Sequence, residues 1–237
     1  MSANKVEDPA RPVEGVARAA SRAVTDRLWA YSDGVFAVIV TIMVLQLRPP
    51  HSADLSALSS LWPTFVSYVV SYVFIAIIWI NHHYLTRFID QPSLALTWTN
   101  FVHLLFVSLV PFTTAWMAQT KLSRSPVMVY AALFLCAATA YNVLERHILS
   151  HADLLSARTR KIARRRSLVA LSLFTAATLA SAVRPWLGFG LVCAALVLHV
   201  KPDVGAASDG RGSGESLPDV RDAPADACAY SGAGRLT

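Results

Sequence analysis

The stretch RLWAYSDGVFAVIVTIMVLQL, Arg27–Leu47, is almost wholly apolar, yet it holds one carboxylate, Asp33, between Ser32 and Gly34. A membrane-spanning helix needs about 20 predominantly apolar residues, so this stretch is long enough to cross a bilayer. A charged side chain at the centre of such a helix costs about 2.5–3.5 kcal/mol on insertion scales, and it is usually paired and functional. The stretch therefore predicts a membrane helix whose acid has polar partners.

Composition extends this prediction to the whole chain. Of its 237 residues, 54% are hydrophobic and only 15% are charged, whereas soluble domains average about 25% charged residues. We predict an all-α, multi-pass membrane protein with six transmembrane helices. The expected spans are Leu28–Leu47, Leu61–Asn81, Leu94–Ala118, Val127–Leu144, Leu168–Val183 and Trp186–Val200. The last two are short, and a single re-entrant hairpin is the alternative for them.

The distribution of Lys and Arg predicts the orientation and the domain boundaries. The densest basic cluster, SARTRKIARRR at 156–166, is expected to be a loop between the fourth and fifth spans. By the positive-inside rule, six spans place this loop and both termini in the cytoplasm of a cell-membrane protein. We expect a cytoplasmic segment at 1–26 and a six-helix domain at 27–202. The Gly/Ser/Ala/Asp-rich residues 203–237 are too poor in apolar side chains to fold, which predicts a disordered cytoplasmic tail.

Helical geometry assigns the polar and apolar residues of the first span to different sides. Val38, Thr41, Ile42 and Leu45 are spaced i, i+3, i+4 and i+7, so they share one face. Asp33 lies about 140° away from Val38, which directs the acid toward other helices of its own subunit if the apolar face lines a central axis. Its candidate partners are Ser32, Trp79, Asn81, His82, His83, Trp98, Asn100 and His103. Alternatively, Asp33 caps a helix that starts at Gly34 and the tryptophans form interfacial belts.

Several function classes find no support in the sequence. Adjacent residues such as His82 and His83 diverge by about 100° on a helix, so they do not predict a metal site. There is no nucleophile–base pair, HExxH motif or glycine-rich phosphate loop to indicate an enzyme. The three cysteines are isolated, and the basic residues lie between apolar stretches rather than in a nucleic-acid-binding patch. We therefore expect no enzyme activity, no metal, no cofactor and no nucleic acid partner.

Three motifs resemble those of one family. RLWAYSDG resembles the R-x-x-x-F-S-D-G opening of bacterial relatives of the transmembrane protein 175 potassium channels, with Tyr31 in place of the usual Phe. WINHHYLTRF at 79–88 is similar to the second helix of that family, with Trp79 and His82 in matching positions. NFVHLLFVSLVPFTT at 100–114 resembles the third helix, with Asn100 and Pro111–Phe112 in place. The remaining helices agree only in number and hydropathy.

The resemblance implies a potassium-permeable cation channel without a re-entrant selectivity-filter loop. One six-helix unit forms a homotetramer in this family, and the first helix of each subunit lines the pore. By position, Val38 would form an apolar constriction, Thr41 a hydroxyl layer, and Ile42 and Leu45 further apolar rings. Ser32, Asp33, His82 and Asn100, together with Arg27, would form a buried polar network. Arg27 lies only about 20° from Val38, however, which would place it at the cytoplasmic mouth instead.

Two other functions remain as alternatives. A proton-coupled transporter would use Asp33 and His82 to relay protons, and it would show pH-driven uphill uptake of a substrate. A non-conducting membrane scaffold would bind lipid or protein through the basic stretch 156–166, and it would carry no ions.

Overall fold

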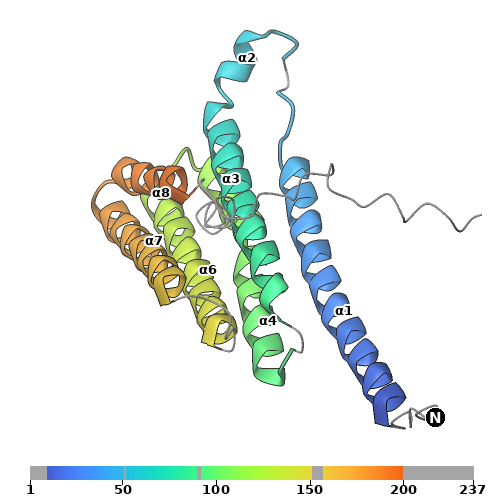
Figure 1. The fold of residues 1–237 in the computed structure, drawn as a ribbon. Coiled ribbons are helices and arrows are strands. Elements are labelled where there is room, and N and C mark those ends of the chain that lie inside the picture. The colour runs from blue at the N-terminus through green and yellow to red at the C-terminus, as the bar shows by residue number, and fades with distance from the viewer. Residues whose placement is uncertain (1–9, 51, 90–91, 151–156, 200–237) are drawn as a thin grey trace, which may run out of the picture. The chain divides into compact units, whose positions relative to one another are not determined.

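All the regular secondary structure in the part that the computed structural model describes is helical; this part comprises residues 10–50, 52–89, 92–150 and 157–199. The predicted disordered tail 203–237 and residues 1–9 lie outside it. Figure 1 shows the arrangement of the helices. They are α1 (Ala10–Leu45), α2 (Ser56–Ser59), α3 (Trp62–Leu85), the 3-10 turn η1 (Thr86–Phe88), α4 (Leu94–Ser108), α5 (Val110–Gln119), α6 (Arg124–Ser150), α7 (Ala157–Val183) and α8 (Pro185–His199).

The first helix is much longer than the predicted span. It begins at Ala10 rather than near Leu28, because the preceding residues are rich in alanine and arginine, which have high helix propensity. Pro12 lies in the first turn, where its missing N–H removes no helical hydrogen bond. The apolar part, Ala20–Leu45, is long enough to cross a membrane.

The third predicted span is broken into two helices. α4 ends at Ser108 and α5 begins at Val110, with Leu109 between them. Pro111 explains this break, because proline has no N–H to donate to the carbonyl group of Val107 and its ring crowds the preceding turn. Together the two helices form one apolar segment, Leu94–Gln119, of sufficient length to span a bilayer.

Residues 157–166 of the basic stretch are not a loop. Helix α7 begins at Ala157, so the prediction of a connecting loop over these residues is wrong. Alanine, arginine and lysine are good helix formers, and the hydropathy pattern that marked the start of the span at Leu168 carries no information about such a polar extension. Similarly, α6 continues to Ser150, beyond the predicted end at Leu144.

Five helical segments of the described chain are long and apolar enough to span a membrane, and α8 is a sixth, shorter apolar helix. The five segments are Ala20–Leu45, Trp62–Phe88, Leu94–Gln119, Arg124–Ser150 and Arg160–Val183. The 15 residues of α8 extend over about 22 Å, less than the hydrocarbon thickness of about 30 Å. The chain is therefore a multi-pass membrane protein of the all-α class.

The helices pack around a common apolar core. α1 contacts α3, α4 and α5, while α6 contacts α7 and α8 as well as α4 and α5 (Figure 1). Aromatic rings join the two groups: Phe74 of α3 stacks on Phe134 of α6 with 3.5 Å between centroids, and Phe174 of α7 meets both rings edge-on. This core fixes the side of α1 that faces inward.

The connection between α7 and α8 is a single residue, Arg184. The two helices approach closely at Gly188. A methyl group on Gly188 would overlap the hydroxyl of Ser181 and lie 2.7 Å from the carbonyl oxygen of Ala177. Small residues at helix–helix contacts allow this kind of close approach in membranes, so Gly188 determines how tightly α8 packs on α7.

Candidate functional site

The two sides of α1 have different surroundings. Phe36, Ile39 and Met43 are only 3%, 3% and 1% exposed, and they belong to the core. On the other side, Val38 is 55%, Ile42 43% and Leu45 81% exposed. A helix in contact with its own bundle over only one side leaves the other side available to something outside the subunit.

Thr41 lies in the same exposed row. Its hydroxyl donates to the carbonyl oxygen of Val38 at 2.8 Å, so the side chain satisfies its donor within the helix. The oxygen lone pairs remain on the exposed side of α1. We call Val38, Thr41, Ile42 and Leu45 the outer stripe; it presents three apolar side chains and one hydroxyl.

A chain of buried hydrogen bonds holds the inner side of α1. The amide oxygen of Asn100 accepts from Nε2 of His82 at 2.8 Å, and Nδ2 of Asn100 donates to Oγ of Ser32 at 2.9 Å. Ser32 Oγ in turn donates to the carbonyl oxygen of Leu28 at 3.1 Å. The three polar side chains are at most 1% exposed. This anchor network joins α1, α3 and α4, and each of its members has a hydrogen-bond partner on another member, as a stable buried polar cluster requires.

Aromatic rings enclose His82. Trp29 and Phe36 of α1 each meet the His82 ring edge-on with 5.4 Å between centroids. His103 of α4 is parallel to it at 6.0 Å, and its Nδ1 donates to the carbonyl oxygen of Ala137 at 3.2 Å. These contacts fix the orientation of the ring whose Nε2 reaches Asn100.

Asp33 has a different partner from Ser32. Its carboxylate accepts a hydrogen bond of 2.9 Å from Nε1 of Trp79 on α3, and the side chain is half-buried. Both residues line an apolar groove of about 550 Å³ between α1 and α3, together with Phe36, Ala37, Val40, Tyr72, Ile75 and Ala76. The acid thus lies at the edge between the packed and the exposed sides of α1, and Trp79 has a more specific role than that of an interfacial residue.

The remaining candidate residues are not part of the anchor network. Arg27 is exposed, and within the described ranges no hydrogen bond or ion pair connects it to Ser32, His82 or Asn100. His83 stacks on Trp79 at 5.5 Å. Trp98 is 63% exposed.

A second buried network escaped prediction. Tyr130 of α6 donates to Oγ of Ser71 at 2.8 Å, and Ser71 donates to Oγ1 of Thr114 at 2.7 Å, because the hydrogen of Thr114 is directed to the carbonyl oxygen of Val110. All three residues are buried and they join α3, α5 and α6. Ser71, a polar residue in the largely apolar predicted span Leu61–Asn81, was the signal for this network in the sequence.

The carboxylate of Glu145 was also missed. It is only 7% exposed and accepts a hydrogen bond of 2.6 Å from Ser167 of α7. The fourth predicted span ends at Leu144, so the sequence analysis did not consider Glu145 as part of a membrane helix. Leu144 and Ile148 keep the i, i+4 spacing of apolar residues past Glu145. This spacing was the signal that the helix continues beyond Glu145.

No group of three or more His, Cys, Asp or Glu side chains arranged to hold a metal ion occurs in the described ranges. The polar side chains near α1 are instead linked to one another. The arrangement is suited to holding one helix in a fixed rotation, with an apolar, partly hydroxylated face turned outward.

Comparisons with known proteins agree with this arrangement. The family model described as "Endosomal/lysosomal potassium channel TMEM175" matches residues 27–111, which include the outer stripe and the anchor network. A potassium channel of Chryseobacterium sp. (strain P1-3) is 38% identical over 124 residues, which cover 52% of this chain and 64% of the relative. A potassium channel of Chamaesiphon minutus is 34% identical over 132 residues, covering 52% and 65%. The chain therefore matches less than two thirds of the length of these two relatives.

A solved structure extends the similarity beyond the matched segment. The crystal structure of a lysosomal potassium-selective channel TMEM175 homolog from Chamaesiphon minutus superposes with a TM-score of 0.68 at 27% identity, covering 75% of this chain and 96% of that one. The resemblance carried by the three sequence motifs is confirmed: residues 27–111 match the TMEM175 family model, and the chain is similar to bacterial potassium channels and to a solved TMEM175 homolog.

Proposed function

We propose that the protein is a potassium-permeable cation channel in which four copies of the chain place their outer stripes around a central pore. The observation that carries this proposal is the exposure of Val38, Ile42 and Leu45 on a helix whose opposite side is held by the anchor network. Two relatives described as potassium channels support the choice of ion. The permeant ion is potassium, and the function requires no cofactor.

Asp33 supports assembly of several copies. In a single subunit its carboxylate lies beside an apolar groove between α1 and α3 and has one hydrogen bond, from Trp79. A carboxylate facing lipid is costly. A neighbouring subunit packed over this groove would cover the acid, while the same helix presents Val38 to the centre of the assembly.

The mechanism follows from the chemistry of the outer stripe. A narrow ring of valine and isoleucine side chains excludes water, so an ion crosses it only after losing part of its hydration, and widening of the ring by rotation of α1 would allow conduction. Sodium holds its water more tightly than potassium, which favours potassium at such a ring. The hydroxyl of Thr41 supplies an oxygen ligand next to the apolar layer.

The membrane topology that fits this function has six crossings and both termini in the cytoplasm. Helix α8 is short, but it is antiparallel to the apolar part of α7, and Nε2 of His199 at its end donates to the carbonyl oxygen of Arg166. α8 therefore extends over the same depth as Arg166–Val183. The basic residues of α7 then lie at the cytoplasmic surface by the positive-inside rule.

Cation flux from liposomes tests the proposal. Purified protein should release potassium faster than sodium down equal gradients, and Val38→Asn should raise the flux and reduce the preference for potassium, because an amide wets the constriction. Val44→Asn is the matched control: Val44 is 47% exposed on α1, but it lies about 120° away from Val38, so we expect unchanged flux.

Three outcomes would contradict parts of the proposal. Equal effects of Val38→Asn and Val44→Asn would remove the outer stripe from the pore. Uphill uptake driven by a pH gradient would indicate a transporter that uses Asp33 and His82. Absence of any flux from a folded tetramer would favour a scaffold.

A further inference from the structure

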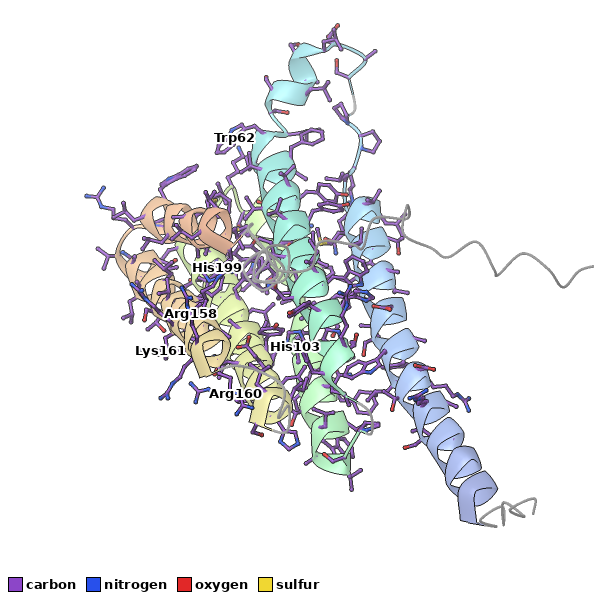
Figure 2. All side chains as sticks on the ribbon, viewed as in Figure 1. Trp62, His103, Arg158, Arg160, Lys161 and His199 are labelled. Atoms are coloured by element: carbon purple, nitrogen blue, oxygen red, sulfur yellow. The ribbon has the colours of Figure 1, made fainter. Side chains whose placement is uncertain are left out.

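A basic pocket lies at the junction of α6 and α7, far along the chain from the outer stripe. It has a volume of about 320 Å³ and is lined by Asn142, Glu145, Arg146, Leu149, Ser150, Arg160 and Arg164. Figure 2 shows Arg158, Arg160 and Lys161 around the N-terminal end of α7, beside the C-terminal end of α6. The pocket is thus bounded by the ends of two membrane-spanning segments.

Helical spacing brings the polar side chains of this pocket together. Asn142 and Arg146 are four residues apart on α6, and Arg160 and Arg164 are four residues apart on α7. Residues at this spacing lie on the same face of a helix. Each helix therefore contributes a pair of donors to a common space, and the other basic residues of the stretch, such as Arg158 and Lys161, are not among the lining residues.

Asn142 provides an independent indication of a ligand. Its side chain is only 5% exposed, and its Nδ2 has no hydrogen-bond partner within the part of the chain that the structure describes. A buried amide without a partner costs about 1–3 kcal/mol. Asn142 also lines the pocket, where an acceptor would satisfy this donor.

The one carboxylate in the wall does not oppose an anion strongly. Glu145 Oε2 accepts the hydrogen of Ser167 at 2.6 Å, so this oxygen is held at the α6–α7 contact. Three arginines remain around the pocket against one acid. Arginine binds phosphate through two parallel N–H groups, which makes it the preferred side chain for phosphate recognition.

We propose that this pocket binds the phosphate of an anionic membrane lipid. Arg146, Arg160 and Arg164 would contact the phosphate oxygens, and Nδ2 of Asn142 would donate a hydrogen bond to the phosphate. A lipid is the occupant because the pocket lies where the spans Arg124–Ser150 and Arg160–Val183 end. Basic pockets between membrane helices on the cytoplasmic side bind anionic headgroups. The inference depends on the membrane location of the chain and not on conduction.

Native mass spectrometry of the purified full chain in neutral detergent tests the proposal. The protein is titrated with dioleoyl phosphatidylglycerol and, separately, with dioleoyl phosphatidylcholine, and the Kd of each lipid is determined from the bound fractions. We expect tighter binding of phosphatidylglycerol. Arg164→Gln should raise its Kd about fivefold, the effect of one basic residue near a charged membrane surface. Asn142→Leu, which changes no charge, should also raise it.

Arg158→Gln is the matched control, because it removes one charge from the same basic stretch of α7 at a residue that does not line the pocket. We expect its Kd for phosphatidylglycerol to equal that of the unmodified protein. Equal weakening by Arg158→Gln and Arg164→Gln would overturn the proposal in favour of a diffuse basic surface. An unchanged Kd for Asn142→Leu would also overturn it.

A second arm distinguishes the lipid from free phosphate. Inorganic phosphate is titrated into the same preparation and followed by calorimetry. Binding of inorganic phosphate as tight as that of phosphatidylglycerol, and lost in Arg164→Gln, would replace the lipid by a soluble anion and overturn the assignment. Binding much weaker than that of the lipid supports it.

Discussion

The two sides of α1 differ in their contacts: one is buried against the subunit, and the other is exposed. The inner side carries Ser32 in the anchor network and buries Phe36, Ile39 and Met43 in the core. Within the described residues the outer stripe belongs to neither the network nor the core, and Leu45 is the most exposed of its apolar members at 81%. Hydrogen bonds fix a rotation more strictly than apolar packing does, because they require defined directions. The difference indicates that the inner side holds the angle at which the outer stripe faces whatever lies beyond the subunit.

The largest effect is expected from a probe of the outer stripe. In a background where Cys136, Cys193 and Cys228 are replaced by serine, Thr41→Cys should react with a charged, membrane-impermeant thiol reagent, and potassium flux should fall almost to zero. The reason is that only a water-accessible thiol reacts, and the added charge would block a narrow pore.

Val44→Cys on the same helix sharpens this test. Val44 is exposed in the subunit but lies outside the outer stripe, about 60° from Thr41 and about 120° from Val38, so we expect neither labelling nor block. Rapid labelling of both positions without loss of flux would mean that the exposed side of α1 is wetted elsewhere than in a pore.

The next effect concerns the anchor network. Asn100→Ala leaves Nε2–H of His82 buried without its acceptor, at a cost of about 1–3 kcal/mol. We expect a lower thermal midpoint by fluorescence-detected size-exclusion chromatography, and a broader distribution of oligomers. Thr99→Ala is the control, because Thr99 is half-buried and its hydroxyl donates within its own helix, to the carbonyl oxygen of Ala95. Equal midpoints for both variants would show that the network does not hold α1.

The smallest effect is expected at the edge between the two sides. Trp79→Phe keeps the ring but removes the hydrogen bond to Asp33, and polar contacts between membrane helices average about 0.6 kcal/mol. The thermal midpoint should fall slightly, measured against Trp98→Phe, whose side chain is 63% exposed. A larger loss than that of Asn100→Ala would reverse the ranking of the two contacts.

Periodicity predicted the side of α1 correctly in one respect. Residues spaced to match the 3.6-residue turn of an α-helix were expected to share a face, and the structure leaves Val38, Ile42 and Leu45 exposed together. Hydropathy did not predict where the helix begins, because it marks only the apolar part of a helix that starts at Ala10. The same limit applies to α7, whose basic first turns are helical.

Contacts between helices were harder to predict than faces. The sequence indicated Ser32, His82 and Asn100 as candidate partners of Asp33, and the structure joins these three to one another rather than to the acid. It listed Trp79 among the candidate partners of Asp33 without singling it out as the donor, and it gave no indication that Ser167 donates to Glu145. Which polar groups meet depends on the rotation and depth of each helix relative to the next, and these follow from packing of the whole core.

The close approach at Gly188 has a practical consequence for anyone who engineers this protein. Replacing a helical glycine by alanine usually stabilises a protein by about 0.4–1 kcal/mol, because alanine restricts the unfolded chain. At Gly188 the added methyl would collide with Ser181 and Ala177 and wedge α8 away from α7, whereas the space around Gly190 is open. Two glycines in one helix, separated by a single residue, thus call for opposite treatment: Gly190 can be replaced by alanine, whereas Gly188 has to remain glycine.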